Sequence, residues 1–219
     1  MGLLMRPGRP ARLGLVTVLA LVAAAACGRP PPEGAVEVTL ADGTQVASWG
    51  DGEYGVVLIA DDGETAADWA ALATEIAANR MAVVALDSAA ADPDTLAAAA
   101  RWLTDGGAER VATIASGDAG GTRLAEAAGD GAAVDQLILI SGSLGDDQLA
   151  ALGEPPKLFI AAEGDEAGSL GAEQMTDAAA GAWNAVLLVP GSDRGAAILG
   201  GEGRDALIDG VVARLEERR

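Results

Sequence analysis

The sequence predicts an α/β domain built around a mostly parallel sheet. Apolar runs of five or six residues recur from residue 35 onward, helical spacings separate them, and the runs are continuous rather than alternating. Continuous apolar runs are typical of parallel strands buried on both faces. Strands that alternate with helices favour β–α–β connections. We therefore expect helices on both faces of the sheet.

The expected strands begin with a hairpin. Val36–Leu40 and Gln45–Trp49 flank Asp42-Gly43, a dipeptide that favours a tight turn. Six further runs are candidates for the parallel strands, namely Val56–Ala60, Ala82–Leu86, Val111–Ala115, Gln136–Ser141, Lys157–Ala162 and Ala185–Pro190.

Helical spacing appears between these runs, with apolar residues at i, i+3, i+4 and i+7. The residues that show it are Trp69, Leu72, Ala73 and Ile76; Leu96, Ala99, Ala100 and Leu103; Met175, Ala178 and Ala179; and Leu207, Ile208, Val211, Val212 and Leu215. Aromatic residues make up only 3% of the chain, so the core should be aliphatic. The four tryptophans are expected to pack helices on the sheet or to cover the hairpin.

The composition excludes several kinds of site. The chain has no histidine, which removes the commonest general base and the commonest metal ligand. Its single cysteine, Cys27, rules out an intrachain disulfide and a thiolate cluster. The net charge of −19 opposes binding of nucleic acids. We expect neither a metal nor a cofactor.

The first 26 residues have the form of a signal peptide. Arg6, Arg9 and Arg12 precede the apolar run Leu13–Ala26, which is too short to span a bilayer comfortably. Their removal makes the net charge −22, because three arginines and no acids are lost.

Small residues directly before Cys27 resemble the lipobox of bacterial lipoproteins. In that family the cysteine is acylated with fatty acids such as palmitate, and the chain is cut just before it. The resemblance implies a signal peptide at 1–26, a lipidated Cys27 with a stiff Pro-rich tether at 27–34, and a folded domain at 35–219 on the extracytoplasmic side of a membrane. The alternative is an ordinary secretory signal, which would release a free domain.

Six segments of the folded part resemble, in order, those of the α/β-hydrolase family. They are Val56–Gly63, Asp68–Asp87, Glu109–Ala115, Ser116–Gly120, Lys157–Asp165 and Pro190–Gly195. The resemblance covers nearly all of 35–219 and implies an α/β-hydrolase-like sheet with an N-terminal hairpin. Periodicity alone would also permit an unrelated doubly wound sheet.

The residues that match the family's catalytic positions are unusual. In Ser116–Gly120 the nucleophile position holds Asp118, within the small-residue pattern that a sharp strand-to-helix turn requires. Asp165 matches the family's acid, and Arg194 stands where the family has its histidine. Asp61, Asp62 and Ala119 match the oxyanion loop and its second donor. Arginine accepts no proton near neutral pH.

This pattern leads to two functional hypotheses. The first is an inactive, membrane-anchored member of the fold that binds a small polar or cationic molecule or serves as a scaffold. Asp118, Asp165 and Arg194 would line its cleft as an ion-paired cluster. The second is an active esterase-like hydrolase that uses Asp118 as nucleophile. Ser116, Ser141, Ser143 and Ser192 have no identifiable base, so we expect them to make loop hydrogen bonds.

Overall fold

The computed structural model of the chain describes residues 30–129 and 134–217. The predicted signal segment and Cys27 lie outside the described residues. Residues 31–219 form one compact unit. No helix within the described ranges combines the length and the apolar character needed to cross a membrane.

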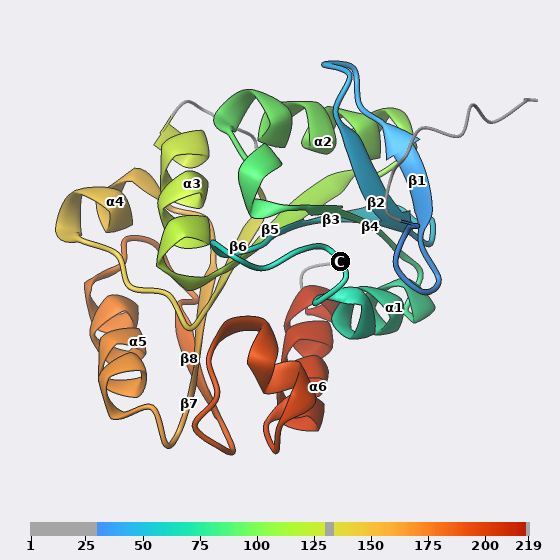
Figure 1. Ribbon diagram of the computed structural model, residues 1–219. Coiled ribbons are helices and arrows are strands. Elements are labelled where there is room, and N and C mark those ends of the chain that lie inside the picture. Colours follow the sequence, from blue (N-terminus) through green and yellow to red (C-terminus); the bar gives the residue numbers. More distant parts are fainter. Residues whose placement is uncertain (1–29, 130–133, 218–219) are drawn as a thin grey trace, which may run out of the picture. The chain divides into compact units, whose positions relative to one another are not determined.

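A twisted sheet of eight strands forms the centre of the described domain (Figure 1). The spatial order is β1-β2-β4-β3-β5-β6-β7-β8. Strand β2 pairs antiparallel with β1 and β4, and every other pairing is parallel. The strands are β1 (Val36–Thr39), β2 (Gln45–Trp49), β3 (Tyr54–Ile59), β4 (Met81–Leu86), β5 (Arg110–Ser116), β6 (Gln136–Ile140), β7 (Lys157–Ala162) and β8 (Ala185–Val189).

Helices cover both faces of the sheet (Figure 1). One face packs against α1 (Ala70–Ala78) and α6 (Arg204–Glu216), together with the 3₁₀ turn η2 (Gly195–Gly200). The opposite face packs against α2 (Pro93–Asp105), α3 (Gly117–Gly129), α4 (Asp146–Ala151) and α5 (Glu166–Ala178). A second 3₁₀ turn, η1 (Ser88–Ala90), precedes α2. The predicted fold class, a mostly parallel α/β sheet with an N-terminal hairpin, is confirmed.

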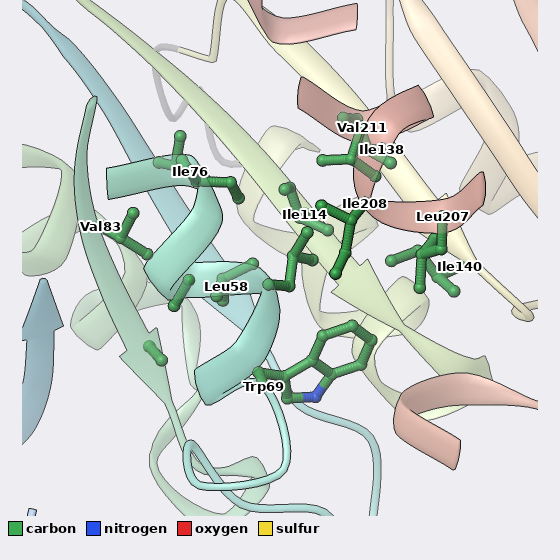
Figure 2. Packing of buried hydrophobic residues seen from close by; sticks show 14 of the residues in the cluster. Leu58, Trp69, Ile76, Val83, Ile114, Ile138, Ile140, Leu207, Ile208 and Val211 are labelled. Carbon is green, nitrogen blue, oxygen red and sulfur yellow. The ribbon is translucent and has the colours of Figure 1, made fainter. Parts of the chain in front are cut away.

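The core on each face is aliphatic, as the composition predicts. Figure 2 shows the cluster under α1 and α6, where Leu58, Ile76 and Val211 pack with other branched side chains and Trp69 lies at one end of the group. Trp69 and Trp49 are each only 2% exposed, so they pack against the sheet as expected. Trp183 differs from the prediction, since it is 69% exposed in the loop before β8.

Local signals explain where several elements begin. The hairpin turn contains Gly43 at φ 92°, and the Asp42 carboxylate accepts a hydrogen bond from the Thr44 N–H. Asp92 caps α2 by accepting from the Thr95 N–H, and Pro93 follows at the first helical position. Asp165 caps α5 in the same way through the Gly168 N–H.

The described end of the predicted tether packs against the domain rather than extending from it. The Pro32 carbonyl accepts from the Ala35 N–H in a turn, and the Glu33 carbonyl accepts from the Trp49 indole at 3.0 Å. Gly34 lies against Trp49 and Thr74. Because Trp49 ends β2, this turn lies at the end of the sheet where the parallel strands begin.

Candidate functional site

The predicted site residues gather where the parallel strands end. Because β3 and β5–β8 are parallel, the loops that follow them meet at one edge of the sheet, called here the carboxyl edge. Two cavities open there and share Glu64 and Arg194. The smaller, of 210 Å³, is lined by Asp61, Glu64, Gly117, Asp118, Ser141, Arg194 and Gly195. The larger, of 480 Å³, is lined by Gly63, Glu64, Ala67, Asp68, Ala71, Arg194, Ala196, Ala197, Leu199 and Gly200.

The sharp turn from β5 into α3 has Gly117 at its apex. Gly117 has φ 64°, whereas Asp118 already belongs to the helix and has no positive φ. In the α/β-hydrolase family, the strained residue at this strand-to-helix turn carries the nucleophile. The backbone position that we assigned to Asp118 from the sequence is therefore occupied by Gly117, one residue earlier, which carries no side chain.

The carboxylate of Asp61 fills the space in front of Gly117. A Cβ built on Gly117 would overlap the Asp61 carboxylate. The same carboxylate accepts a hydrogen bond from the Ala119 N–H at 3.1 Å, in the first turn of α3. A helix N-terminus favours negative charge, so this position suits an anion. The protein's own Asp61 thus occupies the space that a side chain at Gly117 would need. With Gly117 at the nucleophile position, the residue after it is Asp118, so the oxyanion donor that we assigned to Ala119 from the sequence also moves one residue earlier.

Glu64 fixes the loop that carries Asp61. Its carboxylate accepts three hydrogen bonds, from the Asp61 N–H at 3.0 Å, the Trp69 indole at 3.0 Å and the Ala196 N–H at 2.7 Å. Two of these donors belong to the β3–α1 loop and the third belongs to η2, so Glu64 joins the loop to η2. Glu64 was not predicted from the sequence, because a loop with four acids gives no sign of which one points inward.

Arg194 and Asp165 form the ion pair that the sequence predicts. The Arg194 Nε lies 3.0 Å from Asp165 Oδ2, and Arg194 also donates to the Ser141 carbonyl at 3.1 Å. Asp118 lines the same small cavity as Arg194, but its carboxylate accepts from the Ser143 N–H at 2.7 Å. The expected pair of Arg194 with Asp165 is therefore present, whereas no ion pair joins Asp118 to Arg194 in the part of the chain that the structure describes, and Asp118 is tied to the β6–α4 loop instead.

The side chain of Asp62 differs from that of Asp61 in its partner and its exposure. Asp62 is exposed and forms an ion pair with Arg123 of α3 at 2.8 Å, on the outside of the loop.

Ser116 and Ser141 are 1% and 4% exposed, and among the described residues their hydroxyls have no hydrogen-bond partner. This differs from the prediction that these hydroxyls make hydrogen bonds within loops. Two buried polar groups beside the small cavity are therefore unsatisfied.

The described residues contain no group of three or more acidic or other ligating side chains arranged to hold a metal ion. The carboxylates of Asp61 and Glu64 are instead held by backbone and indole N–H groups.

Several solved structures are similar to this architecture. A CIB-like hydrolase from Thermoplasma acidophilum superposes with a TM-score of 0.63 and 15% identity, covering 84% of this chain and 98% of that one. The domain has the α/β-hydrolase fold. A dienelactone hydrolase from Anabaena variabilis gives a TM-score of 0.64 at 16% identity, over 84% of this chain and 96% of that one. The esterase domain of a Rhodothermus marinus protein gives 0.62 at 15% identity, over 82% and 96%.

No family model matches the sequence. No curated protein matches it either. The likeness therefore concerns the fold, and the chemistry of the site depends on this chain's own residues.

Proposed function

We propose that this protein is a lipoprotein, anchored by an acylated Cys27 on the extracytoplasmic side of a bacterial membrane, whose α/β-hydrolase-like domain binds a small molecule without cleaving it. The observation that carries the second part is the Asp61 carboxylate, which fills the space in front of Gly117 and accepts from the Ala119 N–H.

Three features oppose the reaction that the fold supports elsewhere. Gly117 offers no nucleophilic atom at the sharp turn. The chain has no histidine, and Arg194, which is paired with Asp165, accepts no proton near neutral pH. A negative charge that develops beside Asp61 would be repelled instead of stabilised, which reverses the usual electrostatic help to acyl transfer.

The lining of the small cavity favours a polar or cationic ligand. It contains the carboxylates of Asp61, Glu64 and Asp118, while the guanidinium of Arg194 is already paired with Asp165. The adjoining cavity adds alanines and Leu199, which suit a short aliphatic group. An amine with a short alkyl chain has both features.

Two measurements on the purified full chain test this function. We expect no turnover of p-nitrophenyl esters above background and no labelling by fluorophosphonate probes. Turnover that is lost in Asp118→Ala would contradict the proposal and favour a hydrolase with Asp118 as nucleophile. In calorimetric titrations we expect butylamine to bind more tightly than butyrate, with the preference reduced in Asp118→Asn. A preference for butyrate would overturn the ligand class.

A further inference from the structure

The folded domain begins only a few residues after Cys27 along the chain. The described turn at Pro32–Ala35 is held by the Trp49 indole, and Pro32 is five residue steps along the chain from Cys27. A fully extended chain of that length spans at most about 18 Å. A domain tied to lipid at Cys27 therefore has to lie close to the headgroups, and one of its faces has to be turned toward them.

The attachment lies at the end of the sheet opposite the cleft. Trp49 is the last residue of β2, which runs antiparallel to β4 and pairs with Val83 near the start of that strand. The loops that precede the parallel strands lie at this end, called here the amino edge. The two cavities lie at the carboxyl edge.

The two edges carry very different charge. The described loops of the carboxyl edge contain eleven acids and a single base, Arg194. The acids lie in residues 40–44 (one), 60–69 (four), 87–92 (two), 163–165 (two) and 190–203 (two). The helix termini leave this difference unchanged, because the first turns at this edge hold six acids and Arg204, and the last turns at the amino edge hold five acids and Arg214.

The described loops of the amino edge are closer to neutral. Residues 30–35, 50–53, 106–109, 134–135 and 152–156 contain six acids, and Arg80 lies in 79–80. Arg110 and Lys157 are the first residues of β5 and β7, so they add positive charge at the same edge.

From the tether length and this charge difference we infer that the anchored protein turns its amino edge toward the bilayer and its cleft away from it. An anionic bilayer repels the carboxyl edge much more strongly than the amino edge. At physiological salt this repulsion acts within roughly 8–10 Å, and a tether of at most about 18 Å lets the edge that faces the bilayer come within that range. The ligand then reaches the cleft from the aqueous phase instead of from the lipid. This inference depends on the lipid anchor proposed above.

Site-specific labelling of the full chain tests the orientation. Asp51→Cys lies in the β2–β3 loop of the amino edge, and Ser192→Cys lies in the β8–η2 loop of the carboxyl edge; both positions are exposed. Acylation of Cys27 leaves the introduced thiol as the only one that reacts with a maleimide dye. The labelled protein is reconstituted in phosphatidylglycerol vesicles that contain lipids spin-labelled at the headgroup.

We expect the dye at position 51 to be quenched several-fold more strongly than the dye at position 192. Equal quenching, or stronger quenching at 192, overturns the orientation. Mass spectrometry of the Cys27 peptide is measured on the same sample. A Cys27 without acyl chains overturns the anchor itself and the orientation with it, so the two failures are distinguishable.

Discussion

The two edges of the sheet hold their buried polar groups in different surroundings. At the amino edge, Lys157 is 1% exposed, and its ammonium donates to the carbonyls of Gly153, Pro155 and Ala180 at 2.6–2.8 Å. At the carboxyl edge, two buried serine hydroxyls lack any such partner among the described residues, and cavities lie beside them. Unpartnered buried atoms occur at the amino edge too, at Asn184 Oδ1 and Arg214 Nε, but these two residues line neither of the two cavities. The buried ammonium of the amino edge thus contributes to stability, whereas the unpartnered hydroxyls of the carboxyl edge lie beside cavities, as in binding sites.

The largest expected effect is at the amino edge. Lys157→Met leaves three carbonyls without their donor, and each unsatisfied buried acceptor costs about 1–3 kcal/mol. We expect the free energy of unfolding, measured by urea denaturation, to fall by about 3 kcal/mol. Arg123→Met is the control, because its partner Asp62 is exposed and such pairs contribute at most about 1 kcal/mol. Equal losses in the two variants would contradict the comparison.

Lys157 also gives the amino edge a pH dependence. Burial holds the pKa of Lys157 below its ordinary value of 10.5, with the charge of Glu154 opposing this in part. The folded state therefore loses this proton at a lower pH than the unfolded state does. Between these two pKa values the unfolded state binds more protons, so the free energy of unfolding should rise with pH.

Urea denaturation at steps from neutral pH to pH 10.5 measures this contribution as the difference between the wild type and Lys157→Met. The wild type should gain stability relative to the variant as the pH rises. Parallel curves for the two proteins would show that the ammonium is not penalised by its burial.

An intermediate effect is expected at Glu64, on the carboxyl edge. In Glu64→Gln the amide places an NH₂ group against one of the three donors that the carboxylate now accepts. The expected loss of unfolding free energy is about 1–2 kcal/mol. The emission of Trp69, whose indole donates to Glu64, should shift as well. Glu75→Gln on the exposed side of α1 is the matched control, and a loss as large there would refute the role of Glu64.

The smallest effect is expected at Asp118. Asp118→Asn keeps the oxygen that accepts from the Ser143 N–H, and it removes only the favourable charge in the first turn of α3. That charge contributes about 0.3–1 kcal/mol at an exposed position. Thermal unfolding should therefore change little, although binding of butylamine should weaken. A large loss of stability would mean that Asp118 is a structural residue.

The sheet was predictable because its strands carry a strong local signal. Each buried strand is a continuous apolar run bounded by Gly, Asp or Pro, and the observed bounds of β7 equal the predicted ones. The short helix α4 was missed, since six residues are too few to show helical periodicity.

The site was less predictable than the fold, for a physical reason. The pairing of Arg194 with Asp165 could be expected, because opposite charges at neighbouring strand ends attract. The position of the apex could not, because Ser116–Gly120 contains several small residues that satisfy the same turn. The direction of the Asp61 side chain depends on the Ala119 N–H, 58 residues away, which no local pattern encodes.

Gly117 limits which side chains can be introduced at the sharp turn. A residue with a side chain in this left-handed conformation would strain the backbone by about 1–3 kcal/mol, whereas glycine adopts it freely. Gly117→Ser alone would add that strain and would also collide with the Asp61 carboxylate. At least two positions have to change before a hydroxyl fits at the turn, and the change at Asp61 has to come first.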